Sequence, residues 1–277
     1  MSGGQFARDQ AEWRWRAYFM PDTTTLRKNL GIIDPEALRA VEYRISSVRR
    51  QQLDQGTVVV PRTFDDAHLV AVHRHLFGDV YPWAGQPRTV NMAKDGRNFA
   101  DVEHEVMGQV WEAKVVVART PWERLDREEF AVAMAEVTAH LNFAHPFREG
   151  NGRTTRVLLE HLAERTPFAL DFTRVSAQVW NQASAASMPT GRGEAPDLAP
   201  LVPVFRALTV DRDPPSPARG QGLERSVQRS PGQLAALANP HRMPLTALQR
   251  QQDSTRLRDQ ASTVDLPRGP AERQQGR

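Results

Sequence analysis

Apolar residues recur at intervals of three and four positions along most of the chain up to about residue 210. This period indicates amphipathic helices that bury one face. Asp34 and Pro35 form a helix-start signal, because aspartate can cap a first turn and proline suits the first helical position. We therefore predict a core-facing helix from residue 35, with a buried stripe made of Leu38, Val41, Ile45 and Val48.

Three further segments show the same helical spacing. Asp65 is placed to cap a helix, and the inward residues of that helix would be Leu69, Val72, Leu76 and Phe77. The acidic residues at 126–129 favour another start, followed by a buried stripe of Phe130, Met134, Val137 and Leu141. This helix should end before Pro146. Residues 154–165 continue as a helix whose inward residues are Val157, Leu158 and Leu162.

One segment, residues 87–100, departs from the helical period. Thr89 to Met92 form a short extended run, and Asp95-Gly96 is a strong turn signal. The sequence therefore predicts a small β-hairpin near residues 88–100. The expected fold class is all-α, a helical bundle that carries this one hairpin.

The composition of the chain changes at about residue 211. Aromatic residues recur from Trp13 to Phe205, whereas residues 211–277 contain no Phe, Tyr or Trp and are rich in Arg, Gln, Pro and Ser. Such a segment buries too little apolar surface to offset the entropy lost on ordering. We predict one helical domain over residues 1–210 and a mostly disordered tail over residues 211–277.

Composition also excludes several function classes. The absence of cysteine excludes disulfides, thiolate metal sites and cysteine nucleophiles. There is no apolar run of membrane length and no apolar stretch typical of a signal peptide, so a cytoplasmic protein without a membrane partner is expected. The net charge is +3, and the arginines are interleaved with acids, so nucleic-acid binding is not favoured.

The stretch HPFREGNGRTTR, residues 145–156, lies between two predicted helices and concentrates the candidate chemistry. A helix that opens with Gly-Asn-Gly, residues 150–152, presents unobstructed backbone N–H groups at its positive end, which suits phosphate. Arg153 and Arg156 lie three positions apart on one helical face and could both contact phosphate oxygens. These features describe a site for a nucleotide polyphosphate.

Two further residues of this stretch suggest the reaction. Glu149 is the only carboxylate in the loop, and a hard oxygen beside phosphates is a usual ligand of Mg²⁺. His145 has an ordinary pKa of about 6.5, which suits a general base for a hydroxyl group. The expected reaction is attack of that hydroxyl at phosphorus. Each residue also has an ordinary interpretation, for example an ion pair between Arg156 and Glu160, and it is their concentration in one loop that favours chemistry.

The same stretch matches the signature of the Fic family at every defined position: His, any residue, Phe, any residue, an acid, Gly-Asn-Gly-Arg, two free positions and Arg. Residues 18–42 resemble the N-terminal part of bacterial Fic toxins. Residues 63–100 resemble the helix, Trp-Ala-Gly corner and flap of the family, and residues 172–184 resemble its closing helical part. The resemblance covers about residues 15 to 208.

The resemblance implies a protein adenylyltransferase, a bacterial toxin or effector that transfers AMP from ATP to a hydroxyl side chain of a target protein. His145 would be the base, and Glu149 would hold Mg²⁺. The nucleotide would be bound by Gly150, Asn151, Gly152, Arg153 and Arg156, the last at the γ-phosphate. The flap would register the target by strand addition, through Lys94, Asp95, Gly96, Arg97, Asn98 and Phe99. Trp83, Ala84 and Gly85 are interpreted as packing residues.

Regulation is expected to act in trans. Many Fic proteins are inhibited by a glutamate that follows Ser or Thr after three residues and precedes Gly or Asn. The nearest match here is Thr190 to Glu194, but Ala195 follows, and its glycines suit a helix poorly. We therefore expect a separate small antitoxin whose glutamate pairs with Arg156, with constitutive activity as the main alternative.

Other functions remain open at this point. The chain could use another nucleotide or a phosphocholine donor, or be a catalytically idle module that binds a protein through the flap. Phosphorylating relatives place lysine where Gly152 stands, which speaks against kinase activity. A nucleic-acid binder acting through the tail arginines would show a steep salt dependence. The tail could instead serve for translocation into another cell.

Overall fold

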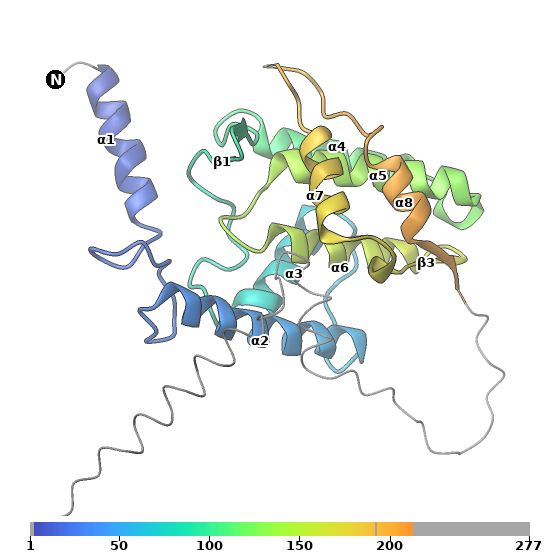
Figure 1. The fold of residues 1–277 in the computed structure, drawn as a ribbon, viewed down its shortest axis with the longest axis horizontal. Coiled ribbons are helices and arrows are strands. Elements are labelled where there is room, and N and C mark those ends of the chain that lie inside the picture. Colours follow the sequence, from blue (N-terminus) through green and yellow to red (C-terminus); the bar gives the residue numbers. More distant parts are fainter. Residues whose placement is uncertain (1–2, 192, 213–277) are drawn as a thin grey trace, which may run out of the picture. The chain divides into compact units, whose positions relative to one another are not determined.

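The computed structural model describes residues 3–191 and 193–212. Their helices are α1 (Gly3–Arg16), α2 (Pro35–Asp54), α3 (Asp66–Phe77), α4 (Val106–Arg119), α5 (Arg127–Ala144), α6 (Asn151–Ala163), α7 (Ala177–Ala186) and α8 (Val202–Leu208) (Figure 1). The strands are β1 (Ala93–Lys94), β2 (Arg97–Asn98), β3 (Phe168–Leu170) and β4 (Thr209–Asp211). The predicted all-α fold with a small hairpin is confirmed. None of the helices described is both long and apolar enough to cross a membrane.

Aspartate caps start the helices as predicted. The side chain of Asp34 accepts a hydrogen bond from the Ala37 N–H at 2.6 Å, and Asp65 accepts one from the His68 N–H at 3.2 Å. Asp126 and Glu129 form a reciprocal capping box at the start of α5. α5 then ends at Ala144, before Pro146 as expected.

The central helix of the main core is α5, which packs against α4, α6 and α8. Its predicted stripe is confirmed, because Phe130, Met134, Val137 and Leu141 are all buried. The stripes predicted for α3 and α6 are buried as well. α6 also packs against α3, and α3 against α2. The two helices that flank residues 145–150 are therefore fixed from several sides.

The stripe predicted for α2 is confirmed only in part. Leu38 is buried and Ile45 packs against the core, but Val48 is 57% exposed, and the inward face also includes Glu42 and Ser46. The reason is that the face of α2 that packs inward carries polar groups with partners inside the protein, so apolar spacing alone misjudges its rotation. Tyr81 donates a 2.5 Å hydrogen bond to Glu42, which satisfies this buried acid.

A second two-stranded sheet was not predicted. β3 pairs antiparallel with β4, with Ala169 opposite Val210, and the Arg212 N–H donates to the Pro167 carbonyl at 2.8 Å. The described structure thus includes the first two residues of the predicted tail. The rest of that tail, residues 213–277, lies outside the described residues, and the proposed domain division stays a prediction.

Two histidines form a buried, neutral pair between α3 and α6. The Phe64 N–H donates to His68 Nδ1 at 3.3 Å, so His68 carries its proton on Nε2 and donates it to His161 Nδ1 at 2.9 Å. The rings stack, with centroids 5.1 Å apart. Burial, together with the charge of Arg62, lowers the pKa of His68 to about 4 and of His161 to about 3.

We expect acid to destabilise the protein between pH 6.5 and about 4. Unfolded histidines take up protons in this window, whereas native His68 and His161 stay neutral, so the free energy of unfolding falls as the pH falls. Each histidine should contribute about 1.4 kcal/mol per pH unit within the window. Urea unfolding followed by circular dichroism across this range checks the expectation.

The double variant His68→Gln/His161→Gln provides the control. It removes both titrating groups of the pair, so the free energy of unfolding should depend less steeply on pH in this window. A free energy of unfolding that stays constant from pH 7 to pH 5 would contradict the assignment of a neutral pair.

Candidate active site

The loop between α5 and α6 is closed by the side chain of Asn151. Its Oδ1 accepts from the Phe147 N–H at 2.8 Å, and its Nδ2 donates to the Phe147 carbonyl at 2.7 Å. Phe147 is buried, as predicted. Because the Asn151 side chain is used in this way, its contribution to an anion site would come from its backbone N–H.

Two glycines of the loop have different structural requirements. Gly150 has φ +82°, and a Cβ there would lie 2.4 Å from a ring carbon of Phe77, so both conformation and space require glycine. A Cβ on Gly152 would meet nothing within 4 Å. The described chain therefore does not require glycine at this position, and the opening leaves the backbone of the first turn of α6 accessible to a ligand.

His73 holds the loop from α3. The Gly85 N–H donates to His73 Nδ1 at 2.8 Å, so the proton lies on Nε2, which donates to the Glu149 carbonyl at 2.9 Å. Its ring stacks on Phe147 with centroids 3.8 Å apart. Burial lowers the pKa of His73 to about 4, so the ring stays neutral. The Trp-Ala-Gly corner therefore serves as packing and support for the loop, in keeping with its interpretation from the sequence.

His145 is the C-cap residue that follows α5, and its backbone is left-handed, with φ 42° and ψ 57°. Its imidazole stacks on Phe99 of the flap, with centroids 3.8 Å apart and planes inclined by 21°. Burial and then the charge of Arg88 lower its pKa to about 3, while a hydrogen bond with the main chain of Asn142 acts in the opposite direction. The ordinary pKa assumed from the sequence is thus not the one this environment gives. The neutral form, which can accept a proton, persists well below neutral pH.

The flap is the predicted hairpin. Asp95 and Gly96 both have positive φ, 51° and 77°, as a tight two-residue turn requires. Ala93 pairs with Asn98, and Lys94 with Arg97. Residues 93–98 are exposed, and the Arg97 guanidinium donates to the Ala185 carbonyl of α7 at 2.6 Å.

Glu149, the predicted Mg²⁺ ligand, accepts a hydrogen bond from the Gly150 N–H at 3.0 Å through Oε1. Its side chain is 43% exposed and lies 3.6 Å from the Arg153 guanidinium. Within residues 3–191 and 193–212 there is no group of three acidic, histidine or cysteine side chains that could hold a metal. One carboxylate fits Mg²⁺ bound together with nucleotide phosphates, which supply the remaining oxygen ligands with water.

Arg153 is engaged by protein groups. Its guanidinium pairs with Glu42 and donates to Ser46 at 3.0 Å, both on α2, and lies over the ring of Phe77. The predicted phosphate contact of Arg153 stays a prediction, and such a contact would share the guanidinium with Glu42.

Arg156 lies one turn further along α6. Its Nε is 3.6 Å from Glu160, the ordinary ion pair that the sequence suggested, and its guanidinium lies over the Phe172 ring at 3.7 Å. Glu160 also pairs with Arg50 of α2. The two arginines thus project from the same helix, and each is held by a carboxylate.

Three supporting residues were missed by the sequence analysis: Glu42, His73 and Arg88. The sequence could have indicated Glu42, because it stands four residues after Leu38 and so lies on the same inward face of the helix. The other two stand in the segments that resembled the family, but nothing in their spacing marked them.

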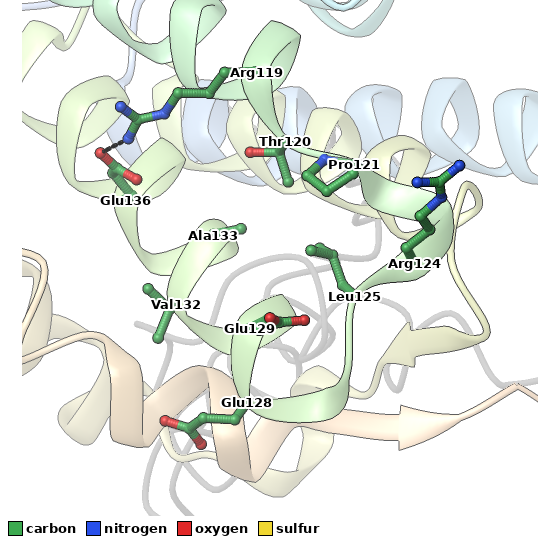
Figure 2. A pocket seen from close by; sticks show the side chains of 10 residues that line it. All are labelled: Arg119, Thr120, Pro121, Arg124, Leu125, Glu128, Glu129, Val132, Ala133 and Glu136. Carbon is green, nitrogen blue, oxygen red and sulfur yellow. Dashed lines mark hydrogen bonds and ion pairs between the residues drawn. The ribbon is translucent and has the colours of Figure 1, made fainter.

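A surface hollow of about 610 Å³ lies elsewhere, beside the end of α4 and the start of α5 (Figure 2). Its acidic side chains are already used within the fold. Glu136 pairs with Arg119, Glu128 pairs with Arg206, and Glu129 completes the capping box of α5. This hollow is therefore not favoured as the active site.

Comparison with known proteins agrees with this geometry. Residues 63–163 match the Fic/DOC family. The chain is 30% identical over 197 residues to a probable protein adenylyltransferase, Fic, of Salmonella typhimurium, a match that spans 68% of this chain and 90% of that protein. The chain belongs to the Fic/DOC family. The family predicted from the sequence is confirmed.

Two further relatives extend the comparison. The chain is 36% identical over 173 residues to the protein adenylyltransferase VbhT of Bartonella schoenbuchensis. This match spans 61% of this chain but only 35% of VbhT. A solved Fic domain of a VirB-translocated Bep effector from Bartonella quintana, with bound ADP, has a TM-score of 0.60 and 26% identity, covering 71% of this chain and 95% of the other.

We expect the two loop glycines to respond differently to alanine. Gly150→Ala should destabilise the protein by about 2 kcal/mol or more, because it combines a strained φ with a clash against Phe77. Gly152→Ala should leave stability unchanged or raise it by about 0.5–1 kcal/mol, yet weaken ATP binding about tenfold or more, because a methyl group would occupy the ligand's approach. Thermal unfolding and calorimetric titration of ATP with Mg²⁺ measure both effects. Unchanged ATP affinity in Gly152→Ala would remove this residue from the nucleotide site.

Proposed function

We propose that this chain is a protein adenylyltransferase that transfers AMP from ATP to a hydroxyl side chain of a target protein. The enzyme class predicted from the sequence is confirmed by relatives of that name at about 30% identity over most of their length. The observation that carries the proposal is the neutral imidazole of His145, which lies against the flap at one end of the loop whose other end opens α6.

The described residues suggest how the reaction is divided among them. The target hydroxyl would lose its proton to His145 as its oxygen attacks the α-phosphorus, forming the new O–P bond. The bond from the α-phosphorus to the oxygen that bridges to the β-phosphorus breaks, and pyrophosphate leaves. Bound Mg²⁺, held by Glu149, would neutralise charge on the phosphates.

The nucleotide would be bound at the start of α6. Backbone N–H groups of Gly150, Asn151 and Gly152, together with Arg153 and Arg156, would face its phosphates. The Gly150 N–H, which here donates to Glu149 at 3.0 Å, would exchange that partner for a phosphate oxygen. ADP is bound in the related Bep effector domain, which supports a nucleotide at this site. Exposure of the hairpin residues 93–98 supports docking of the target backbone by strand addition.

Alternative donors, another nucleotide or phosphocholine, are distinguished from ATP by the same experiment. A catalytically idle binding module is less well supported, because His145, Glu149 and both arginines are all present. A translocated effector is a further proposal, motivated by the VirB-translocated relative. The tail, residues 213–277, would then contain the translocation signal.

ATP labelled in turn at the α- and γ-phosphate, incubated with Mg²⁺, the purified protein and a bacterial lysate, tests the reaction. We expect protein to retain the α label and not the γ label, because pyrophosphate is the leaving group. His145→Ala should abolish transfer but leave ATP affinity within about twofold, whereas Arg156→Ala should weaken both. Arg39→Ala, a change at an exposed residue of α2, serves as the control. Incorporation of γ label, or full activity of His145→Ala, would overturn the proposal.

Regulation in trans is proposed from the contacts of Glu194. This carboxylate accepts hydrogen bonds from Thr190 and Gly191 of its own loop, and these contacts lower its pKa. It therefore acts as a local turn stabiliser. The inhibitory glutamate that would pair with Arg156 is assigned to a separate antitoxin.

We expect Glu194→Gly to leave the rate of labelling within about twofold of the wild type, because only local loop contacts are lost. Expression of the wild-type chain should slow growth of a bacterial host, and a co-expressed small helical antitoxin should restore it. Labelling rates of the two purified proteins and growth curves measure these effects. A sharp increase of labelling in Glu194→Gly would instead identify Glu194 as an inhibitor in cis.

A further inference from the structure

We propose that Arg88 is the positioning residue that sets the distance between the flap and His145, and so controls transfer to the target without contacting the nucleotide. This inference rests on the proposed function. Arg88 is only 2% exposed. It lies outside the signature stretch, and it precedes the two strands of the flap, Ala93–Lys94 and Arg97–Asn98.

The guanidinium of Arg88 is bonded to main-chain carbonyls on both sides of the site. Its Nε donates to the His145 carbonyl at 2.8 Å and its Nη1 to the Val90 carbonyl at 2.6 Å. Its Nη2 donates to the carbonyls of Ala100 and Ala144. The backbone N–H of the same residue donates to the Pro146 carbonyl at 2.8 Å.

These acceptors belong to three segments of the chain whose relative positions must stay fixed. Val90 precedes the hairpin, Ala100 follows it, and residues 144–146 carry the proposed base. The rigid, planar fork of a guanidinium can hold all three at once, whereas a lysine ammonium lacks that geometry. Phe99, next to Ala100, then lies on the imidazole of His145. One side chain therefore fixes how Phe99 and the His145 imidazole lie relative to each other, at the place where a target hydroxyl would have to approach.

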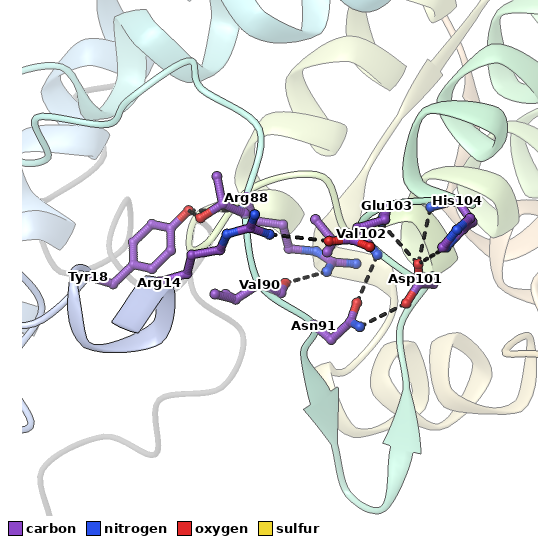
Figure 3. A network of polar contacts seen from close by, with 10 residues as sticks. Arg14, Tyr18, Arg88, Val90, Asn91, Asp101, Val102, Glu103 and His104 are labelled. Atoms are coloured by element: carbon purple, nitrogen blue, oxygen red, sulfur yellow. Dashed lines mark hydrogen bonds and ion pairs between the residues drawn. The ribbon is translucent and has the colours of Figure 1, made fainter. Parts of the chain in front are cut away.

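A polar network around Arg88 stiffens the chain segments that precede and follow the flap hairpin (Figure 3). Asn91 donates to Asp101 at 2.8 Å and accepts from the Val102 N–H at 2.8 Å. Tyr18 accepts from the Thr89 N–H at 3.0 Å. The base of the flap is thus held as a unit, and in the described chain Arg88 is the residue that bonds this unit to the His145 carbonyl.

The charge of Arg88 adds a second effect. In the described chain the acceptors of its hydrogen bonds are carbonyls, and the carboxylate of Asp101 acts on its charge without a hydrogen bond to it. Arg88, Lys94 and Arg148, all cations, act on His145, and each disfavours protonation of the imidazole. Arg88 is the strongest of the three.

Two substitutions of Arg88 separate its role in aligning the flap with His145 from the effect of its positive charge. Arg88→Lys keeps the charge but loses the fork, so we expect label transfer from α-labelled ATP into lysate protein to fall about 10- to 100-fold. The Kd of ATP with Mg²⁺ should stay within about twofold, and the pH profile of transfer should not move. Arg88→Gln loses the charge as well, so protonation of His145, and with it the loss of transfer on acidification, should occur at higher pH.

Two readouts are independent of transfer. Hydrogen exchange of the Ala100 N–H, which is bonded to the Phe143 carbonyl at 3.0 Å, should accelerate in both variants. NMR titration of His145 should show the raised pKa in Arg88→Gln. If the wild-type chain transfers no label, the proposed function fails, whereas these two measurements still decide whether Arg88 couples the flap to His145.

Arg127→Lys is the matched control, because Arg127 also forks onto a carbonyl, that of Thr209, and onto Asp211 away from the site. It should lower the melting temperature without changing the ratio of transfer to ATP affinity. If Arg88→Lys folds poorly, Phe99→Leu, which removes the ring over His145 but keeps the fork, should show the same loss of transfer with unchanged ATP affinity. Wild-type transfer in Arg88→Lys or Phe99→Leu, or a parallel loss of ATP affinity, would overturn the proposal.

Discussion

The paired hydrogen bonds between the Asn151 side chain and the main chain of Phe147 are the interaction on which the site depends. They close the loop over four residues, place Phe147 in the core and leave Gly150 in a left-handed conformation against Phe77. The helix that follows must then begin at residue 151, with its first N–H groups turned towards the predicted phosphate site. The chemistry of the loop is thus a consequence of how its buried amide is satisfied.

Around the loop, histidines stay neutral because they are buried and because cations lie beside them. His73 and His145 lie near arginines and have lowered pKa values, so they stay uncharged. The buried guanidinium of Arg88 is satisfied by carbonyl dipoles, which avoids a second buried charge. Arg153 and Arg156, which are predicted to contact the polyphosphate, are instead paired with carboxylates. The neutral state of His145 keeps it able to accept a proton.

Sequence reasoning was successful where a single local signal determines the structure. Aspartate caps, the Asp95-Gly96 turn and the stripe of α5 each depend on neighbouring residues, and all are present. It was only partly successful for α2. The start of the helix and the burial of Leu38 were predicted, but Val48 is exposed, because the inward face also carries Glu42 and Ser46, whose partners lie on α6 and near α3. The pairing of β3 with β4 was missed for a similar reason, since it joins segments about forty residues apart with too few residues for a period.

The site residues themselves could be named from the signature, but their environment could not. Spacing placed His145 and Glu149 in one loop, yet gave no indication that Phe99 would cover the imidazole or that Glu42 would engage Arg153. Both contacts depend on tertiary packing of distant segments. They also divide the site in two. Glu42, Ser46 and Phe77 hold Arg153, which is predicted to contact the nucleotide, while Arg88 and Phe99 hold His145. Because separate elements support the two halves, the proposed roles imply that ATP affinity and transfer to the target are separable, although both halves are joined by the loop that Asn151 closes.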